Sequence, residues 1–203
     1  MKILAVSDVH SDQRFMQKMA EKGAKEKVDL VILAGDIFTL DGWTDGLVKP
    51  FVEKGLEVAV IPGNHEGMAH INFMVQKYGA KNLHGYSLVK RDGSGDIGIF
   101  GCGYADISHH TLTEDEFFNT LKQAHEQVKH CQRKVMVTHV QPSESILGLH
   151  HPKWGSKGVR KAVEEFRPDL HICGHVHETH GIEEMIGKTR CINVGKTGKI
   201  IEV

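Results

Sequence analysis

The stretch KILAVSDVH, residues 2–10, joins a short apolar run directly to an aspartate and a histidine. Residues 2–6 form a short apolar run, which predicts a buried β-strand. Asp8 and His10 follow at once, and binding sites in open α/β sheets form beyond the carboxyl ends of the strands. The opening of the chain therefore predicts an α/β fold with a site at one edge of the sheet.

Four other apolar runs end in the same way. Residues 30–34, 58–61, 135–137 and 170–173 each lead into residue types that bind metals in proteins. Taken one at a time, such clusters also suit ordinary turns or helix caps. If the five strands are neighbours in one sheet, their polar ends converge on one edge. The side chains that would meet there are Asp8, His10, Asp36, Asn64, His65, Glu66, His139, His175 and His177.

Helical patterns separate the strands. Apolar residues recur at helical spacing over residues 12–27, and Thr113 with Glu116 forms a capping-box pattern at the start of residues 113–129. Shorter helices are expected at residues 44–54, 67–78 and 156–166. Residues 86–103 predict a hairpin, and three short β-like runs follow at residues 179–186, 189–194 and 199–203. This order predicts mixed sheets covered by helices, in a single domain that spans residues 1–203.

The composition is that of an ordinary soluble globular protein and narrows the partners. The chain has 203 residues with 25 Lys and Arg against 26 Asp and Glu, so it lacks the basic field that attracts nucleic acids or membrane surfaces. No apolar run approaches the roughly eighteen residues of a membrane span, and the N-terminus turns polar too soon for a signal peptide. We therefore expect a cytoplasmic protein without membrane insertion. Its four cysteines show no CxxC spacing and are expected to be reduced thiols.

Together the motifs resemble the signature of the calcineurin-like metallophosphoesterases. The resemblance rests on Asp8-x-His10, Gly35-Asp36, Gly63-Asn64-His65-Glu66, the lone His139 and Gly174-His175-x-His177, and it spans positions 8 to 177. It implies a four-layer αββα sandwich, in which two mixed β-sheets are flanked by helices, with a dinuclear metal centre at one strand edge. The chain departs from many small members after His139, where Val140-Gln141-Pro142-Ser143 stands in place of a proline-rich turn.

The resemblance also implies a role for each candidate residue. His65 is not a metal ligand in the family and is implied to be the catalytic residue that faces the substrate. Glu66 is either an acid at a helix start or a carboxylate that orients His65. The implied metal ligands are Asp8, His10, His177 and a bridging Asp36 for one ion, and Asp36, Asn64, His139 and His175 for the other.

The donor set agrees with this interpretation on chemical grounds. Two carboxylates, four imidazoles and one amide favour transition metals over Mg²⁺ or Ca²⁺. We expect two divalent ions, Mn²⁺ first, with Fe, Zn, Ni or Co ions as alternatives. Two ions about 3.5–4 Å apart can clamp phosphoryl oxygens and generate the hydroxide that attacks the phosphorus. Their charge also attracts a phosphate anion to a chain whose own net charge is -1.

The leading functional hypothesis is therefore a dinuclear metal-dependent phosphoesterase. A phosphodiester or a small organic phosphate is favoured as substrate over a phosphoprotein, because the short chain leaves little room for a protein-docking surface. Two alternatives stay open, a nuclease acting on DNA or RNA and a non-catalytic protein-interaction scaffold of the same fold. The presence of His65 and of all seven implied ligands places the scaffold last. The natural substrate, the physiological metal and the oligomeric state are left open by the sequence.

Several other residues are candidates for the substrate side. His109 with His110 and His150 with His151 lie in predicted loops, where binding residues concentrate. Trp43 lies near the predicted site edge, and Trp154 either stacks on a flat group or packs its loop against the core. The histidines outside the implied set are mostly expected on the surface or on helices, except His171, which lies within a predicted strand. These histidines are His70, His84, His109, His110, His125, His130, His150, His151, His171 and His180.

Overall fold

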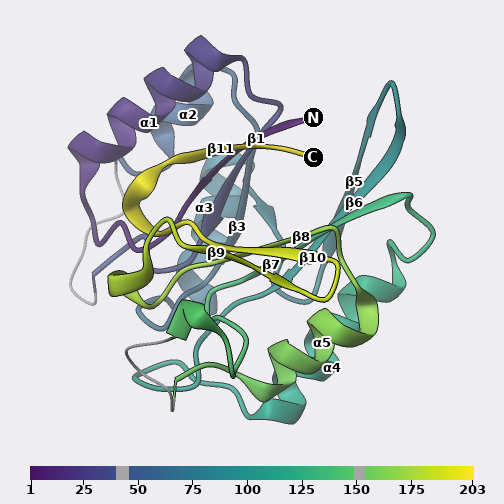
Figure 1. Cartoon of the computed structure of the whole chain (residues 1–203). Coiled ribbons are helices and arrows are strands. Elements are labelled where there is room, and N and C mark those ends of the chain that lie inside the picture. The colour runs from purple at the N-terminus through teal and green to yellow at the C-terminus, as the bar shows by residue number, and fades with distance from the viewer. Residues whose placement is uncertain (40–45, 149–153) are drawn as a thin grey trace.

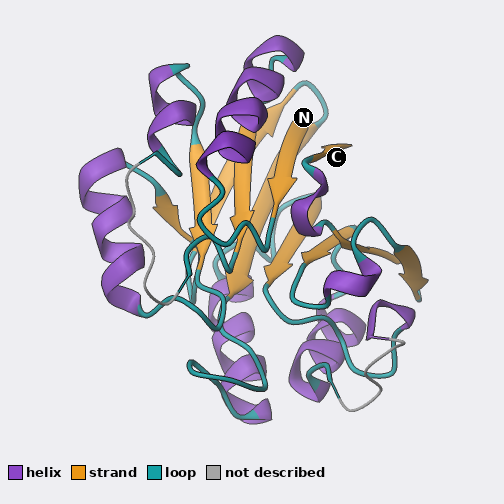
Figure 2. Ribbon diagram, turned by 90° about the vertical axis from the view of Figure 1, so that its left-hand side faces the viewer, coloured by secondary structure: helices purple, strands orange, loops and turns teal. Residues whose placement is uncertain are grey.

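Two mixed β-sheets form the centre of the molecule, and helices cover their outer faces (Figure 1). The computed structural model describes residues 1–39, 46–148 and 154–203. The predicted four-layer αββα sandwich is confirmed by these two sheets and the flanking helices (Figure 2).

The first sheet has five strands in the order β11-β1-β2-β3-β4. Strands β1 to β4 are parallel to one another, and β11 pairs antiparallel with β1. The strands are β1 (Lys2–Val6), β2 (Leu30–Ala34), β3 (Val58–Ile61), β4 (Lys81–Asn82) and β11 (Lys199–Glu202).

The second sheet has six strands in the order β5-β6-β7-β8-β10-β9. Strands β6, β7, β8 and β10 are parallel, while β5 and β9 pair antiparallel at the two edges. The strands are β5 (Ser87–Asp92), β6 (Gly95–Cys102), β7 (Arg133–Thr138), β8 (Leu170–Cys173), β9 (Glu183–Ile186) and β10 (Thr189–Asn193). The predicted hairpin is confirmed as the β5–β6 pair, which extends away from the body of the molecule (Figure 1).

Alternation along the buried strands builds the core on both faces of each sheet. Successive side chains of a strand point to opposite faces. Ile3 and Ala5 of β1 accordingly join the apolar cluster between the two sheets, whereas Leu4 and Val6 join the cluster beneath the helices. The first sheet is covered by α1 (Gln13–Glu26), α2 (Lys49–Glu53) and α3 (Met68–Tyr78), and the second by α4 (Glu114–Glu126) and α5 (Lys157–Phe166).

Local capping signals in the sequence predict helix starts well. The capping box is confirmed, because Thr113 N donates to Glu116 Oε2 at 2.8 Å and Glu116 N donates to Thr113 Oγ1 at 3.3 Å. The helix predicted over residues 44–54 is shorter in the structure, where α2 begins at Lys49; residues 44 and 45 lie outside the described part of the chain. In the β-like run predicted at residues 179–186 the strand begins only at Glu183, after the 3₁₀ turn His177–Thr179.

The structure also bears on the expected state of the cysteines and on the expected absence of a membrane span. All four cysteines are free and buried. Among the described residues, no helix combines the length and the apolar character that crossing a membrane requires.

Candidate metal centre

The carboxyl ends of five parallel strands come together at one edge of the sandwich. The sequence predicted this convergence for the case that the five strands are neighbours in one sheet. The strands instead divide between the two predicted sheets, with β1, β2 and β3 in the first and β7 and β8 in the second. The ends of the two sheets contact each other directly. His139 Nδ1, after β7, lies 2.9 Å from Ala34 O at the end of β2, and His175 N, after β8, donates to Asp8 Oδ2 at 3.1 Å. The convergence therefore arises between two sheets.

One group of side chains follows β1 and β8. Asp8, His10 and His177 each offer a ligand atom, and these atoms all lie within 4.8 Å of one another. The Nε2 atoms of His10 and His177 are 3.3 Å apart, and His177 Nε2 lies 3.5 Å from Asp8 Oδ1. Two imidazole nitrogens and a carboxylate oxygen thus face one small space, which suits a cation.

A second group surrounds the buried His139. Its Nδ1 lies 2.9 Å from the carbonyl oxygen of Ala34, which can only accept, so Nδ1 carries the proton. In the neutral ring the lone pair is then on Nε2, which lies 3.5 Å from Asp36 Oδ2 and 3.2 Å from Asn64 Oδ1. Three acceptor atoms therefore converge, and a metal ion satisfies such a set.

The electrostatics of His139 support the same conclusion. Burial by itself lowers the pKa of this imidazole, but the charge and the hydrogen bond of Asp36 outweigh burial and raise the pKa to about 10. The buried pocket thus favours a positive charge at this place, which either a proton or a metal ion supplies. The pKa of Asp36 shifts in the opposite direction. Burial raises it, but the neighbouring His139 outweighs burial, so that the pKa of this carboxyl is lowered.

Asp36 lies between the two groups. Its carboxylate lies within 4.8 Å of ligand atoms of Asp8 and His139 and, separately, within 4.8 Å of ligand atoms of His10 and His65. His175 is brought to the same edge, with its ring centroid 5.1 Å from that of His139 and its backbone N donating to Asp8 Oδ2 at 3.1 Å. The Nε2 atom of His175 is directed to Asp106, at 3.8 Å from Oδ1.

Backbone conformation at this edge is unusual. Asp8, His10, Asp36 and His175 all have positive φ angles, at 55°, 48°, 51° and 72°. Residues other than glycine seldom adopt this region, and such outliers gather at functional sites. At Gly63 a Cβ atom would lie 2.1 Å from Asp36 Oδ1, so only glycine allows this close approach. The sharp turns after the strands therefore aim the polar side chains inward.

Glu66 holds these turns in place. It is fully buried and accepts from the backbone N atoms of Asp36, Phe38 and Gly63 at 3.0, 2.8 and 2.6 Å. Burial and the charge of Asp36 raise its pKa to about 7. Its hydrogen bonds bind the loop after β2 to the loop after β3. The suggestion that Glu66 orients His65 therefore gains no support, and Nδ1 of His65 has no hydrogen-bond partner among the described residues.

His180 is a member of this site that the sequence interpretation missed. Its Nε2 lies 3.6 Å from Asp8 Oδ2, and its Nδ1 accepts from Lys196 N at 3.4 Å. Burial raises the pKa of Asp8, but the neighbouring imidazoles of His177 and His180 outweigh burial and hold the pKa well below its usual range. The motif Gly174-His175-x-His177 ends before this residue. Only the 3₁₀ turn that follows carries His180 back toward Asp8.

Comparison with known proteins agrees with this geometry. A family model described as calcineurin-like phosphoesterase matches residues 1–179, a range that includes all five strand ends. The chain belongs to the calcineurin-like phosphoesterase family. Members of this family are metal-dependent phosphoester hydrolases, and the Asp and His groups of this chain offer suitable donors.

Individual relatives extend the comparison over nearly all of this chain. The UPF0046 protein K07C11.7 of Caenorhabditis elegans is 29% identical, over 98% of this chain and 71% of the worm protein. The crystal structure of TT1561 of Thermus thermophilus gives a TM-score of 0.77 at 18% identity, over 96% of this chain and 88% of that one. A structure described as a novel archaeal phosphodiesterase gives a TM-score of 0.55 at 17% identity, over 96% of this chain and 84% of that one. Both structures show the same fold.

A pocket of the phosphoesterase opens directly over the two Asp and His groups. Its volume is about 320 Å³. Trp154 lines it, with a ring centroid 5.9 Å from that of His175, whereas His109 and His110 are not among its lining residues. Trp43, His150 and His151 lie outside the described residues. The lining residues are His10, Asp36, Asn64, His65, Ile107, Ser108, Trp154, His175, His177 and Glu178.

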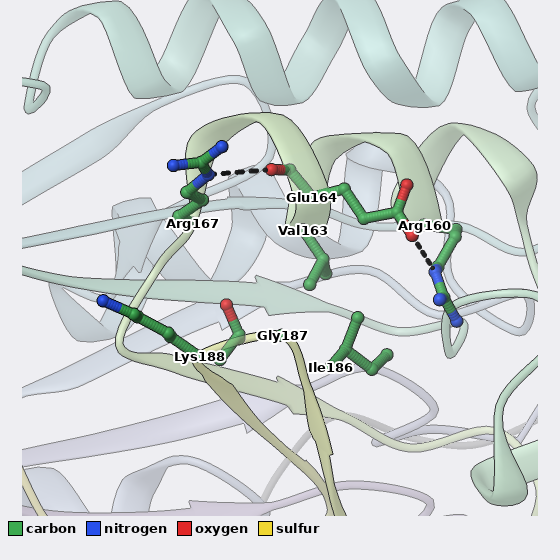
Figure 3. A pocket seen from close by; sticks show the side chains of 8 residues that line it. Arg160, Val163, Glu164, Arg167, Ile186, Gly187 and Lys188 are labelled. Atoms are coloured by element: carbon green, nitrogen blue, oxygen red, sulfur yellow. Dashed lines mark hydrogen bonds and ion pairs between the residues drawn. The ribbon is translucent and has the colours of Figure 1, made fainter.

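A larger pocket of about 500 Å³ lies elsewhere, between α5 and the β9–β10 turn (Figure 3). The two arginines that line it both form hydrogen bonds with Glu164. Arg160 Nε donates to Glu164 Oε1 at 2.6 Å, and Arg167 Nε donates to the carbonyl oxygen of Glu164 at 3.4 Å. None of the predicted site residues lines this pocket. The predicted site residues that line a pocket therefore line the smaller one.

Proposed function

We propose that this chain is a dinuclear metal-dependent phosphoesterase that hydrolyses a phosphodiester or a small organic phosphate. The single observation that carries the proposal is the position of Asp36, whose carboxylate lies within 4.8 Å of ligand atoms of Asp8 and His10 from the first group and of His139 from the second. A carboxylate in this position has one oxygen for each of two ions. It is therefore suited to bridge them.

The proposed ligand sets follow from the two groups. His175 enters the second set through its Nδ1, because Nε2 is directed to Asp106. The mixed nitrogen and oxygen donors suit Mn²⁺, our first choice, and also Fe, Zn, Ni or Co ions. When bound, two such ions supply Lewis acidity toward the phosphoryl group and lower the pKa of water. The proposed ligands are Asp8, His10, His177 and Asp36 for one ion, and Asp36, Asn64, His139 and His175 for the other.

His65 is proposed as the residue that meets the leaving group. Its side chain is 27% exposed, lines the pocket, and has its Nε2 3.7 Å from Asp36 Oδ2. It is therefore next to the proposed bridging carboxylate and open to a bound substrate. From this place an imidazole can donate a proton to a departing oxygen.

The pocket itself supports a diester over a monoester. No lysine or arginine is among the described residues that line it, and Glu178 adds a carboxylate. A monoester dianion brings one more negative charge than a diester, and the described lining residues offer no lysine or arginine to compensate it. Ile107 and Trp154 add apolar and aromatic surface at the wall, which suits a flat group on the substrate.

A substrate panel tests the proposal. Metal-depleted protein is assayed with and without added Mn²⁺ on p-nitrophenyl mono- and diesters, cyclic nucleotides, dinucleotides, mononucleotides and phospholipid headgroups. We expect hydrolysis that disappears with a chelator, returns with Mn²⁺, and is higher for diesters than for matched monoesters. Equal activity in excess chelator, after long dialysis, would contradict the metal mechanism. A preference for monoesters would contradict only the diester assignment.

A further inference from the structure

Asp106, in the loop between β6 and α4, connects the metal centre with the wall of the pocket. We infer that Asp106 is a positioning residue: one carboxylate oxygen accepts the Nε2 proton of His175, so that Nδ1 is left to bind metal, and the other holds the segment that carries Trp154. The inference rests on the proposed function, since it assigns a role within the second metal site.

The first argument is a pair of buried atoms without other partners. Asp106 Oδ1 and His175 Nε2 are 3.8 Å apart, and within the described part of the chain neither has a hydrogen-bond partner. Their side chains are only 14% and 7% exposed. Buried polar atoms are normally paired. The two atoms need to approach by less than ~1 Å to reach hydrogen-bond distance, and a small rotation of either side chain provides this.

The second argument is the choice of tautomer. An ionised carboxylate only accepts hydrogen bonds, so a bond with Asp106 requires the proton on Nε2 of His175. The neutral ring then has its lone pair on Nδ1. Carboxylates commonly hold metal-binding histidines in this way, because the hydrogen bond selects the tautomer and makes the ring more basic. Asp106 thus supplies what His175 needs in order to act as a ligand.

The third argument concerns the other oxygen of Asp106. Oδ2 accepts from Gly155 N at 2.9 Å. Gly155 has a φ of 110°, a conformation that suits glycine, and it directly follows Trp154. Ile107 directly follows Asp106, and both Trp154 and Ile107 line the pocket. One carboxylate therefore links His175 to both apolar side chains of the pocket wall.

Calorimetric titration of metal-free protein with Mn²⁺ tests the inference. For Asp106→Ala we expect the affinity of one of the two sites to fall about 10–100-fold and that of the other to stay unchanged. The affinity of that site in Asp106→Asn should lie between those of the wild type and Asp106→Ala, because an amide offers one acceptor oxygen for two donors. Asp115→Ala, which removes an exposed aspartate of α4, is the matched control and should bind both ions as the wild type does.

NMR of the Zn²⁺-loaded wild type gives a second measurement that needs no variant. Long-range proton–nitrogen correlations should show the proton of His175 on Nε2. A proton on Nδ1, or unchanged affinity of both sites in a folded Asp106→Ala protein, would overturn the inference and leave the proposed function standing. A general loss of stability with equal weakening of both sites would also overturn it. A wild-type protein that binds fewer than two ions contradicts the proposed function, and the inference fails with it.

Discussion

At the scale of single residues, the site depends on where protons and lone pairs lie. His139 donates from Nδ1 to Ala34 O, so its neutral ring presents the lone pair to Asp36 and Asn64. His180 accepts from Lys196 N at Nδ1 and so directs an N–H toward Asp8. In each case a backbone group selects the tautomer of an imidazole. The backbone thus determines which ring nitrogen faces the site when the imidazole is neutral.

Removing the proposed bridging carboxylate should affect both ions. We expect Asp36→Ala to retain neither metal, because Asp36 lies within ligand distance of both groups. Asn64→Ala should retain one ion and bind the other weakly, because Asn64 belongs to the proposed ligand set of one ion, the set that includes His139. Elemental analysis of both proteins after gel filtration measures the metal content. Two tightly bound ions in Asp36→Ala would refute the bridging role.

The proposed proton donor can be separated from a residue that only binds the phosphoryl group. General acid catalysis contributes roughly 10²–10⁴-fold, and it matters for a basic alkoxide leaving group far more than for p-nitrophenolate. We expect His65→Gln to lower kcat/KM for alkyl diesters by about this factor and to affect p-nitrophenyl diesters much less. The measurement is kcat/KM for the Mn²⁺-loaded variant over esters of graded leaving-group basicity. A loss that is the same for all esters would exclude the general-acid role, and metal content serves as the control.

At the scale of elements, close contacts between helices set which glycines can be replaced. Helix α5 begins at Lys157 after the cap Ser156, whose Oγ accepts from Val159 N at 3.1 Å. Glu114, at the start of α4, accepts at Oε2 from both Ser156 Oγ and Gly158 N, each at 2.6 Å. A Cβ atom on Gly158 would lie 2.2 Å from the backbone oxygen of Glu114. The two helices therefore meet at this glycine.

Gly158→Ala should destabilise the protein although alanine is the better helix former. Alanine gains about 1 kcal/mol of helix propensity over glycine, but here the backbone of α4 must move, and overpacking costs about 1–3 kcal/mol. Urea denaturation should therefore show a lower free energy of unfolding. Gly23→Ala in α1 is the matched control, because the atoms nearest to its Cβ belong to side chains and not to backbone, the first being Leu56 Cδ1 at 3.0 Å. A stabilised Gly158→Ala protein would show that α4 and α5 separate freely.

At the scale of the whole molecule, a buried histidine couples folding to pH. His171 lies in β8, is fully buried, and has its Nε2 2.7 Å from Thr138 Oγ1. Burial lowers its pKa to about 3, against about 6.5 in the unfolded chain. The folded protein thus excludes a proton that the unfolded chain binds. Its stabilising contribution is complete above pH 6.5 and is lost as the pH falls toward 3.

We expect this residue to lower the free energy of unfolding by about 2 kcal/mol between pH 7 and pH 5. His171→Gln keeps a donor for Thr138 but does not titrate, so its stability should change less over the same range. Urea denaturation of both proteins at several pH values, in the presence of chelator, measures the difference. Parallel pH profiles for the two proteins would contradict the prediction, whatever the absolute stability of the variant.

The secondary-structure elements and the types of ligand could be predicted from the sequence alone. Apolar runs such as Ile3 to Val6, the cap at Thr113 and the polar residues that follow each strand are local patterns, and local backbone preferences are enough to express them. The resemblance to a family then extended these patterns to a sandwich, and the two sheets confirm it.

That Asp106 and His180 belong to the site became known only from the folded chain. The strand ends meet between two sheets, and Asp106 and His180 reach His175 and Asp8 from loops that carry no motif. Contacts between residues far apart in the chain depend on how the sheets pack, and no local spacing encodes them. Glu66 illustrates the difference. Its sequence position left open an acid at a helix start or a carboxylate that orients His65, whereas in the folded chain it accepts hydrogen bonds from the backbone N atoms of Asp36, Phe38 and Gly63. Local sequence thus specifies the chemistry of the centre, and the packing of the two sheets specifies its geometry.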